Sequence, residues 1–303
     1  MSFVKSHHLL ALLVAAFCAF RAAAADTFGE LKPARVAEIA AMLPETATGF
    51  GRPCADRKFW EDPALRSRLR KTVAEAEKLL SKPMPAWSDD AYLEFSRKGT
   101  RPAGEKMQGQ RSRLLGPLVL AECLENRGRF TAKLNEILEE YAKEPTWTLA
   151  AHDRSLACFR RESYSVDLRS SAFGFELAQA LYLLGGKVAP ETREHVMAAL
   201  RERVFVPVQK SLETGKGSYW LGSKKSPVQN NWNSVCLAGV ASAALAVLPE
   251  RNERAAPRFC RACSQMRTTR QPFLRSPRDT SRSRSRLRMT FVSQNFRFDF
   301  GRV

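Results

Sequence analysis

Asparagine side chains gather just before the most apolar stretch in the body of the chain. Asn230, Asn231 and Asn233 surround Trp232, and an alanine-rich segment follows as far as Leu248. A helix N-terminus leaves its first backbone N–H groups without intrahelical acceptors and carries a partial positive charge. Amide side chains there can therefore either cap the helix or help to bind an anion. The spacing predicts a helix cap or a site for a carboxylate group.

Several short segments, taken in order, resemble a known family. The sequence Asn-Asn-Trp-Asn-Ser-Val-Cys at residues 230–236, followed by Ala-Gly-Val at 238–240, is similar to the heparinase II/III-like polysaccharide lyases. Upstream segments occur in the order expected of that family, as Glu-Pro-Thr-Trp at 144–147, His-Asp at 152–153 and Val-Asp-Leu at 166–168. The resemblance covers roughly residues 30–250. It implies part of an (α/α) toroid with a cleft for a uronic-acid polysaccharide.

The resemblance also implies cleavage by β-elimination, in which a base removes the C5 proton of a uronate. Prearranged amide donors beside the carboxylate stabilise the charge that develops there. In related lyases an asparagine neutralises the carboxylate, and this catalytic role falls first to Asn231, with Asn230 and Asn233 beside it. The chain departs from the family in two respects. Trp232 stands where some alginate-type members have a histidine, and residues 251–303 contain no tyrosine or histidine to serve as base and acid. The chain is therefore expected to be inactive if these groups must come from that region.

Four residues are candidate contacts to the substrate. Trp220 and Trp232 can stack on sugar rings, although large aromatic side chains equally serve as core anchors. His152 either contacts the substrate or is held in its loop by a backbone carbonyl. Tyr219 precedes the asparagine motif, so it is assigned to substrate binding rather than to acid catalysis.

The positive charge of the chain is concentrated near its C-terminus. Residues 251–303 hold 14 arginines, no lysine and 3 acidic residues, and they contribute +11 of the formal +18, whereas residues 26–250 contribute +5. A body with this charge is compatible with an acidic polysaccharide and gives no strong argument for nucleic acid. The Arg-Ser repeat at 281–286 is of a kind that can bind nucleic acid. An export signal on the same chain argues against that partner.

The first 25 residues have the pattern of a secretory signal peptide. Lys5 precedes a 12-residue apolar run at 9–20, and the alanines at 22–25 offer cleavage sites after Ala24 or Ala25. The run is shorter than the ~20 apolar residues of a membrane span, so no stable membrane anchor is expected. The sequence predicts export to the periplasm or the medium.

The seven cysteines predict neither a disulfide scaffold nor a metal site in a chain of this length. Cys260 and Cys263 have the spacing of zinc ligands, but no second ligand pair accompanies them. No cofactor is implied. The cysteines of the body are expected to be small buried apolar residues: Cys54, Cys123, Cys158 and Cys236.

Apolar residues recur every three to four positions through the body, which predicts an all-α fold of helical hairpins. Cap residues and prolines predict helices at 33–43, from Pro63 to Leu80, from Ser88, at 114–125, 130–141 and 166–184, from Pro190, and at 232–248. The polar, glycine-containing residues 101–113 are expected to form a loop that could reach over a cleft. The long connection at 147–154 is expected to be functional.

These features divide the chain into three parts. Residues 1–25 are the signal peptide, and residues 26–250 are an incomplete toroid-like lyase domain. Residues 251–303 are an irregular Arg-rich tail that is disordered or translated out of frame. The predicted function is that of an exported polysaccharide lyase-like protein. The alternatives are a non-catalytic helical carbohydrate-binding or scaffold protein, and a fragment whose uncovered apolar helix faces prevent stable folding.

Overall fold

The computed structural model describes residues 33–214, 218–221 and 231–255, and this part of the chain is all-helical, with no β-strand in it. The predicted signal peptide, Asn230, the Cys260-Cys263 pair and the tail beyond residue 255 lie outside the described residues. Within the described ranges, no helix combines the length and apolarity needed to cross a membrane. The predicted all-α fold is therefore confirmed.

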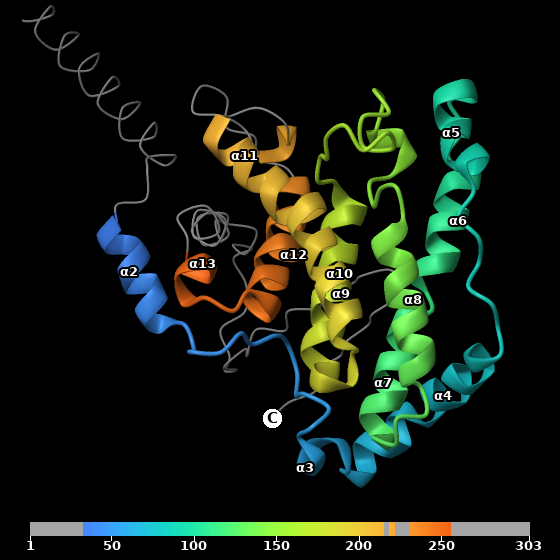
Figure 1. The fold of residues 1–303 in the computed structure, drawn as a ribbon, viewed down its shortest axis with the longest axis vertical. Helices are drawn as coiled ribbons and strands as arrows, with labels where there is room; N and C mark the ends of the chain where they lie inside the picture. The colour runs from blue at the N-terminus through green and yellow to red at the C-terminus, as the bar shows by residue number, and fades with distance from the viewer. Residues whose placement is uncertain (1–32, 215–217, 222–230, 256–303) are drawn as a thin grey trace, which may run out of the picture.

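Most helices follow one another with short connections, the long ones being those before α3 and between α8 and α9, and each helix lies beside a neighbour in sequence or in space (Figure 1). The first half of the chain forms α2 (Pro33–Met42), α3 (Arg57–Trp60), α4 (Pro63–Leu80), α5 (Asp89–Lys98), α6 (Pro102–Ser112), α7 (Leu115–Glu125) and α8 (Thr131–Lys143). The second half forms η2 (Ala150–His152), α9 (Leu168–Leu184), η3 (Gly185–Lys187), α10 (Pro190–Leu200), the π-helical turn η4 (Arg201–Phe205), α11 (Val206–Thr214), η5 (Tyr219–Leu221), α12 (Asn231–Val247) and α13 (Arg251–Ala255).

The predicted cap residues begin the helices that they were expected to begin. Asp62 accepts a hydrogen bond from the backbone N–H of Leu65 at the start of α4, with Pro63 in the first turn. Ser88 accepts one from the N–H of Ala91 at the start of α5. Each cap satisfies a backbone donor that the helix itself leaves free. Local sequence therefore sets these two boundaries.

The prediction of a loop at 101–113 is wrong, because these residues form α6. Pro102 occupies the first turn, where a missing N–H costs nothing. The polar residues that suggested a loop are buried instead of solvated. Arg111, 3% exposed, donates to Glu144 across 2.6 Å, and the Tyr141 hydroxyl donates to the backbone carbonyl of Arg111. Because these polar side chains are buried against polar partners, the buried face of α6 lacks the apolar periodicity from which a helix is predicted.

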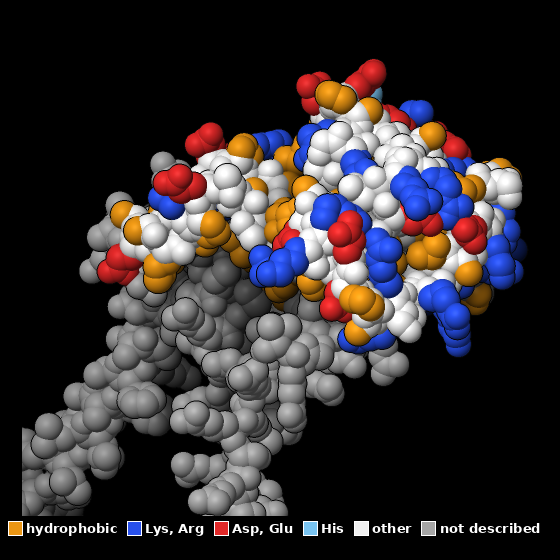
Figure 2. All heavy atoms as spheres, turned by 90° about the horizontal axis from the view of Figure 1, so that it is seen from below, with side chains coloured by type: hydrophobic (Ala, Val, Ile, Leu, Met, Phe, Trp, Pro, Cys, Tyr) orange, Lys and Arg blue, Asp and Glu red, His pale blue; other side chains and the backbone are white. Residues whose placement is uncertain are grey.

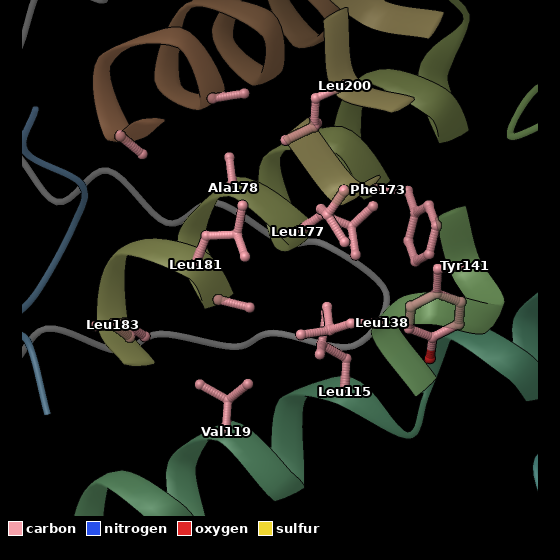
Figure 3. Packing of buried hydrophobic residues seen from close by; sticks show 14 of the residues in the cluster. Leu115, Val119, Leu138, Tyr141, Phe173, Leu177, Ala178, Leu181, Leu183 and Leu200 are labelled. Atoms are coloured by element: carbon pink, nitrogen blue, oxygen red, sulfur yellow. The ribbon is translucent and has the colours of Figure 1, made fainter. Parts of the chain in front are cut away.

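A single apolar core joins α7, α8, α9 and α10 (Figure 3). Leu115 and Val119 of α7 face Leu177 and Leu181 of α9, and all four are at most 1% exposed. On its other side α9 packs along α12. The central position of α9 explains why it is apolar around most of its circumference, as a helix packed on several sides must be.

The described chain continues as a packed helix for five residues past the predicted boundary at residue 250. Helix α13 lies against α2. Arg254, 3% exposed, donates to the backbone carbonyls of Leu248, Pro249, Pro44 and Glu45. Arg254 thus binds carbonyl groups of both segments and holds the two ends of the described chain together.

Helices α9 and α12 touch where glycine allows it. A Cβ added at Gly239 would lie 2.7 Å from the backbone oxygen of Ser171, closer than real contacts come. We predict that Gly239→Ala lowers the free energy of unfolding by about 1–3 kcal/mol, because the helices must separate to admit the methyl group. Urea denaturation followed by circular dichroism measures this change.

The matched control is Gly109→Ala in α6, where a new Cβ meets nothing within 4 Å. This change should raise the free energy of unfolding by up to about 1 kcal/mol through helix propensity. Equal effects of the two substitutions would contradict the proposed role of the contact between α9 and α12.

Candidate functional site

The candidate site is built around the residue that begins the central helix. Asp167 is the N-cap of α9, and its Oδ1 accepts hydrogen bonds from the Ser170 backbone N–H at 2.7 Å and from the Ser170 hydroxyl at 2.8 Å. The Ser170 hydroxyl also lies 2.8 Å from the Asp167 N–H, which closes a capping box. This reciprocal pairing satisfies helix donors and leaves Oδ2 available to other partners.

The second oxygen of Asp167 holds the connection that carries His152. Oδ2 accepts from the backbone N–H of Leu149 at 3.0 Å and lies 2.7 Å from His152 Nδ1. The turn η2 brings the imidazole to this position. A carboxylate, and not the backbone carbonyl considered from sequence, therefore orients His152.

The ionisation of Asp167 reflects this set of donors. Burial by itself raises the pKa of the carboxyl group, but the hydrogen bonds from His152, Ser170 and Leu149 outweigh it and leave the pKa below its usual value. Asp167 is thus an anion at neutral pH. An imidazole whose Nδ1–H donates to this anion presents Nε2 as a proton acceptor.

The beginning of α12 lies against His152. The Trp232 and His152 rings meet edge to face, with their centroids 4.6 Å apart. Since His152 is bound to the N-cap of α9, the N-termini of α9 and α12 lie at the same place in the fold. Asn231, the first residue of α12, is exposed. Asn231 is therefore an exposed residue next to the tryptophan that contacts His152.

Asn233 and Trp220 are used inside the protein. Asn233 is 7% exposed, and its Nδ2 donates to the backbone carbonyl of Trp220 at 2.9 Å. Trp220 is fully buried, and its indole N–H donates to the carbonyl of Val166 at 2.6 Å. The structure thus gives Trp220 the place of a core anchor. Together these two residues connect α12, η5 and the start of α9.

Of the predicted site residues, His152 and Trp232 are in contact, and Asn231 is the exposed neighbour of Trp232 at the start of α12. Asn230 lies outside the described residues, and of Tyr219 only the backbone, in η5, is described. Asp167 was noted within a segment of the family resemblance but was not identified as a site residue. Its signal in the sequence is the spacing Asp167-x-x-Ser170, which is that of a capping box.

A separate cavity of about 400 Å³ lies between α4 and the C-terminal end of α7. Three arginines line it, Arg66, Arg70 and Arg127, over an apolar base that includes Val73 and Leu124. Seen from the end of the molecule where α3 and α4 lie, Lys and Arg side chains gather on part of the face (Figure 2). None of the residues predicted from sequence lines this cavity.

The carboxylates of this cavity are already paired. Arg129 lies 2.9 Å from Glu77 and 2.5 Å from Glu125. Neither Arg70 nor Arg127 forms an ion pair with another described residue. The cavity therefore offers positive charge to an anion.

Comparison with known proteins adds no relative, since no protein family and no curated protein matches the chain. Among the described residues, no three His, Cys, Asp or Glu side chains are grouped so that they could hold a metal ion. The polar groups of the candidate site are the imidazole of His152, the carboxylate of Asp167 and the amide of Asn231.

The pKa of Asp167 makes the stability of the fold dependent on pH. The folded-state pKa is lowered, so the ionised carboxylate contributes stability above the unfolded-state value, and this contribution is lost as the pH falls through the folded-state value. We predict that Asp167→Asn lowers the free energy of unfolding by about 1–3 kcal/mol at pH 7. The difference from the wild type should shrink below about pH 4. Urea titrations at a series of pH values measure both effects.

Asp62→Asn is the matched control, because Asp62 is an exposed N-cap and asparagine caps helices about as well as aspartate. It should change the free energy of unfolding by only a few tenths of a kcal/mol. An Asp167→Asn effect that stays constant with pH would show that the charge of Asp167 contributes nothing.

Proposed function

We propose that the chain is an exported polysaccharide lyase-like protein that binds a uronic-acid polysaccharide where α9 and α12 begin. The observation that carries the proposal is the 2.7 Å contact between His152 Nδ1 and Asp167, next to the first residues of α12. This arrangement supplies an oriented proton acceptor that sequence reasoning placed only among the substrate contacts. In this proposal the base does not have to come from residues beyond 250.

Each residue of the site has a defined task in the proposed β-elimination. Asn231 donates to the uronate carboxylate and stabilises the charge that builds up as the C5 proton leaves. His152 accepts that proton on Nε2, and Asp167 stabilises the imidazolium that forms. The imidazolium can return the proton to the glycosidic oxygen when both lie on one face of the sugar ring. Trp232 holds the imidazole from the side and borders the place for the sugar.

The helical pairs are consistent with the larger architecture that the family resemblance implies. Helices α5 and α6 pack together, α8 packs with α10, and α9 packs with α7 and α12. Of these pairs, α5 and α6 form a hairpin of neighbours in sequence, and the others join helices with at least one helix between them in the chain, as the alternating inner and outer helices of an (α/α) toroid would. We include this arrangement, in partial form, in the proposal.

The test is an ultraviolet assay for unsaturated uronate on a panel that includes heparan sulfate and alginate. We predict activity that falls about 100-fold or more in His152→Ala, because a positioned base contributes about 10²–10⁴-fold. Asn231→Ala should cause a similar loss through the missing donor to the carboxylate.

Ser234→Ala is the control, since Ser234 is exposed one turn further along α12 and has no task in the proposed reaction. It should leave the activity unchanged. Thermal melts by circular dichroism establish that each variant is folded. Activity that survives in His152→Ala would overturn the assignment of the base.

The cavity lined by arginines favours a second function, non-catalytic binding of an acidic polysaccharide. Arg70 and Arg127 stand beside an apolar base and have no carboxylate partner among the described residues. Guanidinium groups bind carboxylate and sulfate through charge-assisted hydrogen bonds. Binding here would yield no unsaturated product, which separates it from the lyase reaction.

We predict that replacing both Arg70 and Arg127 with Gln weakens binding to soluble heparin about 10-fold or more, because each charge-assisted hydrogen bond contributes about 1.5–3 kcal/mol. Isothermal titration calorimetry at fixed salt measures the change. Arg113→Gln is the control, since Arg113 is exposed and does not line the cavity. An equal effect in the control would reduce the binding to general charge attraction.

A further inference from the structure

Two buried cysteines from distant parts of the sequence meet in the core. Cys54 precedes α3, and Cys123 lies in the last turn of α7. They are 1% and 0% exposed, and the Cys54 thiol lies 3.6 Å from the carbonyl oxygen of Glu122, the residue before Cys123. Both thiols are free. Cys158 and Cys236 are also free and buried, and among the described residues neither forms a hydrogen bond to another cysteine.

The backbone around the two thiols is held from both sides. Nη1 of Arg57 donates to the carbonyl of Cys54 at 2.9 Å and to the carbonyl of Cys123 at 2.7 Å. One guanidinium nitrogen thus donates hydrogen bonds to the backbone of both cysteines. The N–H of Cys54 donates to the carbonyl of Leu183 at the end of α9, across 2.7 Å. The backbone positions are therefore fixed without any covalent link between the thiols.

The environment favours a thiolate on one member of the pair. The hydrogen bond from Cys123 lowers the pKa of the Cys54 thiol, and although burial opposes this effect, Lys187 adds to it. The same hydrogen bond and burial raise the pKa of Cys123. Such an asymmetric pair has one sulfur suited to nucleophilic attack and a neighbour suited to resolve the product.

We propose that Cys54 and Cys123 form a disulfide when the chain folds in the presence of a disulfide oxidant. The Cys54 thiolate attacks one sulfur of the oxidant, forms a mixed disulfide and releases one thiol. Cys123 then loses its proton and attacks the sulfur of Cys54, which forms the intramolecular bond and releases the second thiol. The two cysteines lose two electrons and two protons in total, and the oxidant is reduced to two thiols.

The bond would fasten the segment before α3 to α7. Since both sulfurs are buried in the folded protein, the exchange takes place late in folding, when the two thiols already lie together but the oxidant can still reach them. A cross-link between residues so far apart in sequence restricts the unfolded chain strongly and therefore stabilises the native state. The proposal concerns stability and does not depend on the proposed lyase function.

The experiment refolds the full chain from denaturant in a mixture of oxidised and reduced glutathione, and in parallel under a thiol reductant. We expect the oxidised protein to be lighter by two hydrogens in intact-mass spectrometry, with a peptide map that links Cys54 to Cys123. We also expect its Tm to be higher by about 10 °C than that of the reduced protein.

Matched variants separate this pair from the other thiols. Cys123→Ser should abolish both the link and the rise in Tm, whereas Cys158→Ser should keep both. The map of the wild-type protein decides the outcome even if a variant fails to fold. Folded, oxidised wild type in which Cys54 and Cys123 are both alkylated by a thiol reagent under denaturing conditions would overturn the proposal. A link to any other cysteine, or a linked protein with no rise in Tm, would overturn it equally.

Discussion

The carboxylate of Asp167 is the interaction on which the rest of the described structure depends. One of its oxygens begins α9, the helix at the centre of the core, and the other fixes the turn that holds His152. Removing a buried carboxylate leaves several donors without acceptors at once, and each such donor costs about 1–3 kcal/mol. The start of the core and the geometry of the candidate site therefore share one anion. A change that weakens either will affect both.

Other buried charges follow the same logic of partnership. Glu122, fully buried at the end of α7, accepts from Lys187 at 2.7 Å and from the backbone N–H groups of Gly128 and Phe130. It thereby fastens the turn between α7 and α8 to the segment after α9. A buried charge is tolerated only when such partners compensate its loss of water. In this way the connections between helices are specified as firmly as the helices themselves.

The features that could be predicted from the sequence are those that depend on residues close together in the chain. Asp62 and Ser88 could be identified as caps, because the donors that they satisfy lie three residues away. Helix α6 could not be identified, because Arg111 is buried only through Glu144, far along the chain. The approach of His152 to Asp167 was hidden for the same reason. Both residues could be noted in the sequence, but the periodicity of a sequence carries no information on how two distant segments meet.

The contact between Gly239 and Ser171 has a consequence for the position of Asn231. Gly239 and Asn231 are eight positions apart in α12, which corresponds to about 12 Å along a helix. A rigid rod that pivots by about 5° at the glycine would carry the amide of Asn231 roughly 1 Å from its place, and a displacement of this size can cost a catalyst about 100-fold in rate. The absence of a single methyl group, two turns away from the proposed site, thus sets the position of the exposed Asn231 side chain.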